Sequence, residues 1–575
     1  MSKASESSSS LGTRQLSRRT FTAYLSSLGL TSTLLTRTLW AQMQEPKAAK
    51  VTKEMLQQAE QLAGLEFTDQ ERDLMLDGLN NYLEIYKKLR TVTLDNSVAP
   101  ALRFDPVPAG MEFEKQQRPM RISRSRELEV PSDLEELAFW PVTDLAGLIK
   151  SRKVSSAELA NMYLARLKRY DPKLQCVITL TEDLAQEQAR RADEEIAAGR
   201  YRGPLHGIPW GAKDLLAVKG YKTTWGAMPY KDQVIDLDAT VVRHLQEAGA
   251  VLIAKLTLGA LAWGDVWFGG KTRSPWNPEE GSSGSSAGPA AATAAGLVGF
   301  SIGSETWGSI VSPSTVCGVT GLRPTFGRVS RYGAMALSWS MDKIGPICRT
   351  VEDCAIVFDA IYGPDGKDAT VVDLPFSWDA SREPKSLKVG YLKRDFEKER
   401  EDKQWKANDE TTLDVLRTLG FDLIPIELPD YPIEAMGFIL TVEAAAAFDE
   451  LTRNNQDDLM VRQIKNAWPN RFREARTVPA VEYIQANRLR TLVIEAMRER
   501  LSGIDVYVSP SLEGRNSLLT NLTGHPAVVL PNGLRKEQTP SSITFTGRLY
   551  GEDKLLTLAK AYQDATSFHL KHPVL

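Results

Sequence analysis

Amphipathic periodicity predicts a pair of helices near the start of the chain. Apolar side chains recur at helical spacing from Met55 to Leu65, and the pattern returns after Thr68. Thr68 followed by Glu71 is typical of the first turn of a helix, because each side chain can bond the other's backbone amide. We therefore expect a helical hairpin over residues 45–95.

The pattern changes twice after the hairpin. Proline and charged residues dominate next, which predicts an extended linker over residues 96–139. Residues 140–575 then alternate between helical periodicity and short apolar runs. The runs that predict strands are CVITLTE (176–182), PLHGIPWGAKDLL (204–216), AVLIAKL (250–256), LKVGYL (387–392), FDLIPIEL (421–428), DVYVSPS (505–511) and SITFTGRLYG (542–551). We expect the strand at 250–256 to be followed by the start of a helix, and residues 435–485 to be mostly helical. This alternation indicates an α/β fold with a large mixed sheet.

One stretch, residues 281–325, is dense in Gly, Ser, Ala and Thr and almost free of charge. Glu305 is its one acid and Arg323 its one base. The composition alone would fit a linker, but the apolar run AAATAAGLVGFSI within it does not. Small residues let backbones approach closely and leave amides free to face a ligand. The serines of this stretch are therefore candidate nucleophiles.

The first residues have the features of an export signal. Ser17-Arg18-Arg19-Thr20-Phe21 precedes the modestly apolar run TAYLSSLGLTSTLL, and small residues follow near Ala41. This resembles a twin-arginine signal, which predicts a targeting segment over residues 1–44 and a periplasmic location. The apolar run is too short and too polar to predict stable membrane insertion.

Composition excludes several classes of function. The 575 residues have a net charge of −3, which argues against a nucleic-acid binder. The four cysteines have no C-x-x-C spacing, so we expect neither a zinc site nor a disulfide framework: Cys176, Cys317, Cys348 and Cys354. Five histidines without an H-E-x-x-H motif disfavour a metal hydrolase. We expect no metal and no cofactor.

Three motifs are similar to those of the amidase signature family. Lys213 lies in IPWGAKDLLAVKGYKTTWGA, Ser285 in SGSSAGPAAA and Ser309 in GSETWGSI. Their order and spacing resemble the family pattern, and the likeness extends from about residue 140 to the C-terminus. It implies a mixed sheet enclosed by helices and attack on an amide carbonyl. It also implies that Ser285, held by a cis peptide bond, relays a proton between Lys213 and Ser309.

Elementary chemistry supports the same roles. A serine hydroxyl is a weak nucleophile until a base takes its proton, and no histidine lies in these loops. A lysine can serve if burial lowers its pKa, which is about 10.4 in water. We expect Lys213 to be that base and Ser309 the nucleophile. The backbone amides of Thr306, Trp307 and Gly308 would form the oxyanion hole.

This chain departs from the family pattern at two positions. Trp307 takes the place of a glycine in the oxyanion loop, and Val311 takes the place of an arginine. A tryptophan amide can serve there only if the local backbone suits a residue other than glycine. The indole favours an apolar or aromatic substrate. We expect Trp307, Ser286 and Arg488 to line the substrate pocket.

The segment before the predicted catalytic domain leaves an alternative function open. The hairpin and linker, through VAPALRFDP, resemble the small C subunit of the tRNA-dependent amidotransferases, and the rest resembles the large catalytic subunit of the same enzymes. The chain could therefore be a glutamine-dependent amidotransferase subunit with a tRNA-binding partner. The export signal and the lack of a basic face oppose this, and favour a small amide and water as the only partners.

Three further alternatives concern the same serines. Gly284-Ser285-Ser286-Ala287-Gly288 fits the G-x-S-x-G elbow of α/β-hydrolases, with Ser286 as nucleophile, but that motif needs a strand directly before it. An esterase or carbamate hydrolase would use the same site as an amidase, and Trp307 alone would favour an inactive binding protein. The prediction is an exported serine amidohydrolase that cleaves a carbon–nitrogen amide bond through an acyl-enzyme, with its substrate and oligomeric state open.

Overall fold

The computed structural model describes residues 51–123 and 128–575. The chain divides into two compact units, one ending at Leu94 and the other running from Asp95 to Leu575. The predicted targeting segment, residues 1–44, lies outside the described residues. Within the described part of the chain, no helix has the length and apolar character needed to cross a membrane.

The first unit contains a helical hairpin, α3 (Lys53–Ala63) and α4 (Asp69–Leu89). Thr68 and Glu71 form the predicted capping box at the start of α4. The two helices are joined by an ion pair in which Arg72 Nη2 lies 2.8 Å from Glu60 Oε2. The predicted helices are confirmed.

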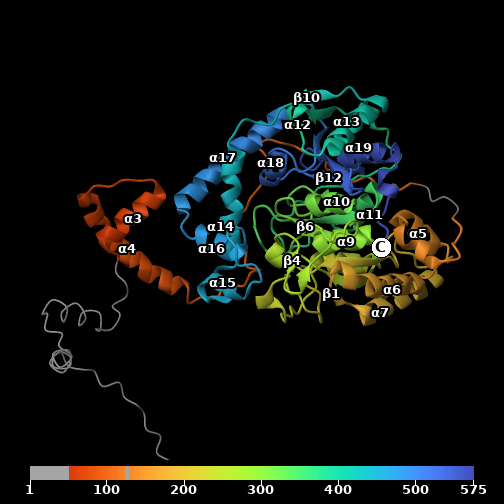
Figure 1. The fold of residues 1–575 in the computed structure, drawn as a ribbon, viewed down its shortest axis with the longest axis horizontal. Coiled ribbons are helices and arrows are strands. Elements are labelled where there is room, and N and C mark those ends of the chain that lie inside the picture. The colour runs from red at the N-terminus through yellow and green to blue at the C-terminus, as the bar shows by residue number, and fades with distance from the viewer. Residues whose placement is uncertain (1–50, 124–127) are drawn as a thin grey trace, which may run out of the picture. The chain divides into compact units, whose positions relative to one another are not determined.

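The second unit is built on one mixed sheet of 11 strands, in the order β1-β3-β2-β6-β8-β7-β12-β13-β11-β9-β10 (Figure 1). The strands are β1 (Val177–Leu180), β2 (Pro209–Lys213), β3 (Val251–Leu256), β6 (Phe300–Glu305), β7 (Thr320–Arg323), β8 (Lys343–Cys348), β9 (Val389–Leu392), β10 (Ile424–Ile426), β11 (Val506–Pro510), β12 (Ala527–Leu534) and β13 (Pro540–Gly547). Strands β2, β3 and β6 pair in parallel, whereas β6, β8, β7, β12 and β13 pair antiparallel. A short hairpin, β4 (Val266–Trp267) and β5 (Gly270–Lys271), stands apart from this sheet. The predicted α/β class with a large mixed sheet is confirmed.

Helices surround the sheet (Figure 1). They are α5 (Val142–Lys150), α6 (Ser156–Leu174), α7 (Glu182–Ala197), α8 (Thr240–Glu247), α9 (Ala287–Ala294), α10 (Val311–Cys317), α11 (Val351–Ile361), α12 (Lys393–Glu397), α13 (Lys403–Thr418), α14 (Phe438–Ala447), α15 (Asp449–Arg453), α16 (Trp468–Ala475), α17 (Ala480–Arg500), α18 (Asn516–Leu522) and α19 (Glu552–Asp564). Helix α7 packs on β3, α9 on β6, α11 on β8 and α13 on β12.

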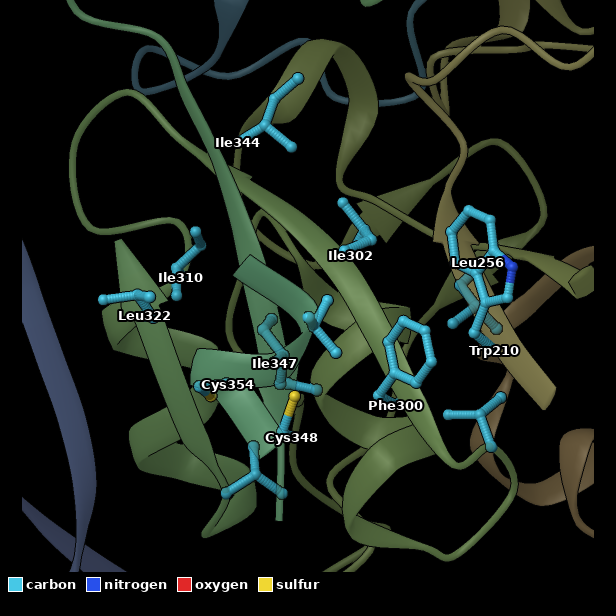
Figure 2. Close-up of a cluster of buried hydrophobic side chains, with 14 of the residues drawn as sticks. Trp210, Leu256, Phe300, Ile302, Ile310, Leu322, Ile344, Ile347, Cys348 and Cys354 are labelled. Atoms are coloured by element: carbon cyan, nitrogen blue, oxygen red, sulfur yellow. The ribbon is translucent and has the colours of Figure 1, made fainter. Parts of the chain in front are cut away.

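Buried side chains of β2, β6 and β8 pack together and fix the strands that lead to the candidate site. Trp210 of β2 stacks on Phe300 of β6, with ring centroids 6.0 Å apart (Figure 2). Ile302 and Ile347 are fully buried in the same cluster, as are Cys348 and Cys354, which behave as small apolar residues (Figure 2). All four cysteines of the chain are buried and unpaired. The ends of β2 and β6 are thereby held by close packing from within the sheet.

One element after β3 differs from the prediction. A helix was expected to start there, but the chain makes a short 3₁₀ turn, η3 (Ala260–Ala262), in which Leu261 and Ala262 have φ of 50° and 60°. A left-handed backbone cannot continue a right-handed helix. The Leu261 carbonyl instead accepts a hydrogen bond from the indole of Trp468, at 2.8 Å.

Several strands had no strong signal in the sequence. Strand β6 lies in the small-residue stretch, where Gly303 interrupts the apolar pattern, and β8 contains the pair Gly345-Pro346. These strands are stabilised by burial between neighbours rather than by strand-forming residues, so propensity alone does not predict them.

Candidate active site

Lys213 is the last residue of β2 and is completely buried. Its ammonium nitrogen lies 2.8 Å from Ser285 Oγ, 3.0 Å from Ser286 Oγ and 2.9 Å from Ser304 Oγ. It also donates to the Ser304 carbonyl at 3.3 Å. No carboxylate of the described residues lies within ion-pair distance of it. Hydroxyl and carbonyl oxygens are thus the only groups that contact this nitrogen.

This environment changes the charge of the lysine near neutral pH. Burial lowers the pKa of Lys213 to about 7, although the more distant Asp342 and Glu305 carboxylates favour the charged form. An ammonium loses hydration on burial, and neutral oxygens replace that loss only in part. Lys213 can therefore exchange a proton at neutral pH.

Ser285 and Ser286 lie in the loop that leads into α9. The Gly284–Ser285 peptide bond is cis, the conformation that the family resemblance implies. A Cβ atom at Gly284 would lie 1.9 Å from the Gly264 carbonyl oxygen, so only glycine fits there. Ser286 Oγ donates to the Ser304 carbonyl at 3.1 Å, which places it against β6.

The elbow interpretation of Ser286 lacks its structural context. The last strand before this serine within the described residues is β5, which ends at Lys271, and a loop fills the interval. A nucleophile elbow requires a strand that enters the turn directly. Ser286 is also fully buried, with its hydroxyl engaged by Lys213 and Ser304.

Ser309 lies in the loop between β6 and α10 and is 8 % exposed. Its carbonyl accepts a hydrogen bond from the Ser286 amide at 3.1 Å. The hydroxyls of Ser283 and Ser312 are 2.7 Å apart and join the loop that leads into α9 to the start of α10. The structure therefore brings together the segments of all three candidate catalytic residues, which are far apart in the sequence.

Residues 306–308 connect β6 to Ser309 and form a bend in the backbone. Gly308 has φ of 80°, a backbone conformation that favours glycine, whereas Trp307 has a negative φ that suits any residue. The position that requires a glycine is therefore still a glycine. A tryptophan at position 307 is compatible with the backbone conformation of this turn. The Trp307 side chain is 47 % exposed. Thr306 is anchored by its hydroxyl, which donates to Asp342 at 2.6 Å.

Glu305 is the residue that sequence reasoning missed. It is fully buried at the end of β6, and Oε2 accepts hydrogen bonds from the amides of Ile310 and Val311 at 2.8 and 3.0 Å. Oε1 accepts from Arg323 at 2.8 Å and from Asn521 at 2.9 Å. One carboxylate therefore holds both ends of the turn that contains Ser309.

Burial alone would raise the pKa of Glu305, but the Arg323 charge and the hydrogen bonds to the loop hold it at about 2. In the sequence, Glu305 and Arg323 are the one acid and the one base of the small-residue stretch. Their isolation among uncharged residues was the signal that could have pointed to Glu305. Val311, which stands where the family has an arginine, is 5 % exposed and contributes its amide to the Glu305 carboxylate. Arg323 supplies the buried positive charge of this loop.

Arg488, which was predicted to line the pocket, and the buried His525 have hydrogen-bond partners other than the three candidate catalytic residues. Arg488 is exposed on α17 and donates to Gln485 at 2.9 Å, so the structure does not bring it to the serines. His525 is buried, which lowers its pKa to about 3, and its carbonyl accepts from Arg323 at 3.0 Å. Within residues 51–123 and 128–575, no group of three His, Cys, Asp or Glu side chains is placed to hold a metal ion.

Comparison with known proteins shows what this chain is similar to. The family described as Amidase matches residues 158–516. The A subunit of the glutamyl-tRNA(Gln) amidotransferase of Methylococcus capsulatus is 32 % identical over an alignment of 478 positions, which covers 75 % of this chain and 98 % of that protein. The corresponding subunit of Heliobacterium modesticaldum is 33 % identical, with the same coverage.

Solved structures of peptide amidases are similar to this chain over about the same share of its length. The native peptide amidase of Stenotrophomonas maltophilia superposes with a TM-score of 0.66 at 29 % identity, covering 75 % of this chain and 97 % of that one. A peptide amidase bound to the competitive inhibitor chymostatin gives a TM-score of 0.68 at 29 % identity, with 76 % and 100 % covered. About a quarter of this chain lies outside each of these matches.

Proposed function

Because the chain belongs to the amidase signature family, whose enzymes act on amide carbon–nitrogen bonds, we propose that it is a serine amidohydrolase with Ser309, Ser285 and Lys213 as its catalytic residues. The observation that carries this proposal is the environment of Lys213. A fully buried lysine without a carboxylate partner, 2.8 Å from one serine hydroxyl, has the position and the lowered pKa of a base.

The 2.8 Å distance between Lys213 Nζ and Ser285 Oγ supports a proton path through Ser285. Neutral Lys213 accepts the hydroxyl proton of Ser285, and Ser285 takes the proton of Ser309 as the Ser309 oxygen attacks the amide carbon. When the tetrahedral intermediate collapses, the carbon–nitrogen bond breaks and the proton returns through Ser285 to the leaving nitrogen. Water then attacks the Ser309 ester by the same relay, releases the acid and restores the serine.

The turn before Ser309 would stabilise the oxyanion. Its amides, at Thr306, Trp307 and Gly308, precede the nucleophile, and each such donor is typically worth about 2.7–4 kcal/mol of barrier. The Glu305 carboxylate binds the amides that follow the nucleophile, so those of the turn before it remain available to substrate. The exposed Trp307 ring favours an amide with an apolar or aromatic group.

The cellular setting is also part of the proposal. The twin-arginine-like segment supports export to the periplasm, and there the partners would be a small amide and water. Peptide amidases among the structural neighbours support hydrolysis rather than nitrogen transfer.

The test is hydrolysis by the purified mature protein of a panel of amides, esters and carbamates, with Ser309→Ala, Ser285→Ala and Ser286→Ala beside it. We expect ammonia or amine release by the wild type, and a serine-reactive fluorophosphonate should label Ser309. Ser309→Ala should abolish both signals. Loss of labelling and activity in Ser286→Ala, with both retained in Ser309→Ala, would overturn the assignment.

A second candidate function has one observation in its favour. The catalytic subunits of glutamyl-tRNA(Gln) amidotransferases match this chain over 97–100 % of their own length. A protein of that kind would hydrolyse glutamine and pass the nitrogen to a partner. Glutaminase activity that rises on addition of a tRNA-binding protein, together with tRNA recovered in a pull-down, would favour this function over the hydrolase.

A further inference from the structure

A cavity of about 450 Å³ lies beside the candidate catalytic group. Ser304 and Thr306 both line it. Ser304 accepts a hydrogen bond from Lys213, and Thr306 belongs to the proposed oxyanion turn. A volume of this size is typical of sites for small organic ligands. The cavity therefore adjoins the proposed catalytic group through these two residues.

Part of the cavity is apolar. It is lined by side chains that are between 3 % and 9 % exposed: Leu215, Ala262, Met335, Leu337 and Ile344. Two carboxylates in the lining already have hydrogen-bond or ion-pair partners within the protein. Asp342 accepts from Thr306, Leu337 and Ser338, and Asp368 pairs with Arg331 at 3.0 Å. An apolar group gains more from this surface than a polar one, because few polar partners are left for it.

Another part of the lining comes from the first residues of the second unit. Residues 96–103, which we call the strap, contribute Asn96, Ser97, Ala99, Pro100, Leu102 and Arg103 to the lining. Most of the strap is exposed on its outer side; Leu102, for example, is 80 % exposed. The lining thus combines the exposed strap with the buried apolar side chains, which we call the floor.

The strap is fixed at both ends. Asn96 Nδ2 donates to the Ala336 carbonyl at 2.9 Å, and Asn96 Oδ1 accepts from the Ala336 amide at 2.8 Å. Arg103 donates to the Ala369 carbonyl at 3.0 Å. Directly after it, the Phe104 ring lies 3.6 Å from the Arg490 guanidinium carbon and 5.0 Å from the Phe326 ring centroid. A short extended segment held at two points forms a wall of fixed position.

We propose that the strap is a specificity wall: together with the apolar floor, it forms a subsite that holds a bulky apolar or aromatic group of the amide substrate. This rests on the proposed amidohydrolase function, and it assigns to residues 96–103 a part in choosing the substrate. We expect an amide with a ring four or five bonds from its carbonyl carbon to reach the strap, and a small amide not to reach it.

The experiment compares aromatic amides with a small one. Butanamide is the small probe, 4-phenylbutanamide places a phenyl ring on the acyl side, and N-(3-phenylpropyl)acetamide places it on the nitrogen. Ala99→Trp narrows the cavity, and Leu102→Ala removes part of the wall. Leu74→Ala is the matched control, because Leu74 is 78 % exposed but lies outside the lining. Thermal melting checks that each variant folds.

We expect Ala99→Trp to lower kcat/KM for at least one aromatic probe about tenfold, and Leu102→Ala to lower it by roughly threefold. Butanamide should change less than twofold in either variant, and Leu74→Ala should change nothing. Equal effects on all three probes, or no effect on either aromatic probe, would overturn the proposal.

A second readout separates this proposal from the proposed function. In a Ser309→Ala background, the dissociation constants of the aromatic probes are measured by calorimetry, without turnover. If the wild type hydrolyses none of the amides, the proposed function fails, yet weaker binding in Ala99→Trp still supports the strap. If the wild type is active and binding ignores both strap substitutions, the strap proposal alone fails.

Discussion

Two lysines lie on neighbouring strands of the sheet, and both are completely buried. Lys213 ends β2, and Lys255 is the residue of β3 that pairs with Ala212, one position away. Lys255 forms an ion pair with Asp214, with Nζ 2.7 Å from Oδ1, and donates to Thr223 Oγ1 at 2.7 Å. Among the described residues, Lys213 has hydroxyl and carbonyl oxygens as its hydrogen-bond partners.

The difference shows how one fold separates a structural lysine from a reactive one. Burial lowers the pKa of Lys255, but the adjacent Asp214 carboxylate opposes that shift directly. Burial lowers the pKa of Lys213 to about 7, with only distant carboxylates against it. The two lysines are equally buried, so the partner is what distinguishes their environments: a carboxylate beside Lys255, and hydroxyl and carbonyl oxygens around Lys213.

The largest expected effect is on catalysis. Lys213→Met should lower kcat/KM for a good amide substrate by roughly 10³-fold or more, because the relay loses its base. Lys255→Met should retain most of its activity per folded molecule. Initial rates, normalised to folded protein, test the pair. Similar losses in both variants would mean that the two lysines do not differ in role.

The next effect is on stability, and it belongs to Lys255. Lys255→Met leaves the buried Asp214 without its counterion and should lower the free energy of unfolding by about 3–5 kcal/mol. The double variant Lys255→Met, Asp214→Asn removes both charges and should recover part of the loss. Denaturant titration measures each value. A loss below about 1 kcal/mol would show that the ion pair contributes little.

Lys213→Met should change stability in the opposite direction. The folded pKa of Lys213, about 7, is lower than its ordinary value of 10.5, so the unfolded chain binds this proton more tightly. The resulting cost is full below pH 7 and fades as pH rises toward 10.5. The variant should therefore be more stable than wild type by roughly 2–4 kcal/mol at about pH 6, and less so at about pH 10. Destabilisation in the acidic range would contradict the assigned environment.

The sequence allowed some of this contrast to be predicted. The motifs predicted Lys213, Ser285 and Ser309, and the alternating pattern predicted the mixed sheet. Asp214 follows Lys213 directly in the sequence, yet it pairs with Lys255. Successive side chains of a strand point to opposite faces, so adjacency along the chain did not reveal this pairing.

Contacts between distant strands could not be predicted at all. The Glu305–Arg323 pair joins the ends of β6 and β7, and neither strand was predicted because small residues hide their periodicity. The strap was predicted only as an extended linker, since nothing in its composition indicates what it packs against. Its place in the cavity wall depends on the three-dimensional fold.

The smallest expected effect is the pH dependence of the reaction, and it tests the contrast most directly. Neutral Lys213 is the active form, so kcat/KM should rise about tenfold per pH unit below about pH 7 and level off above it. Lys255→Met should keep this profile, because Lys255 pairs with Asp214 and takes no part in the proposed relay. The residual activity of Lys213→Met should lack the acidic limb. A limb centred above about pH 9 in the wild type would mean that Lys213 keeps its ordinary affinity for protons, and the two lysines would then differ in partners but not in chemistry.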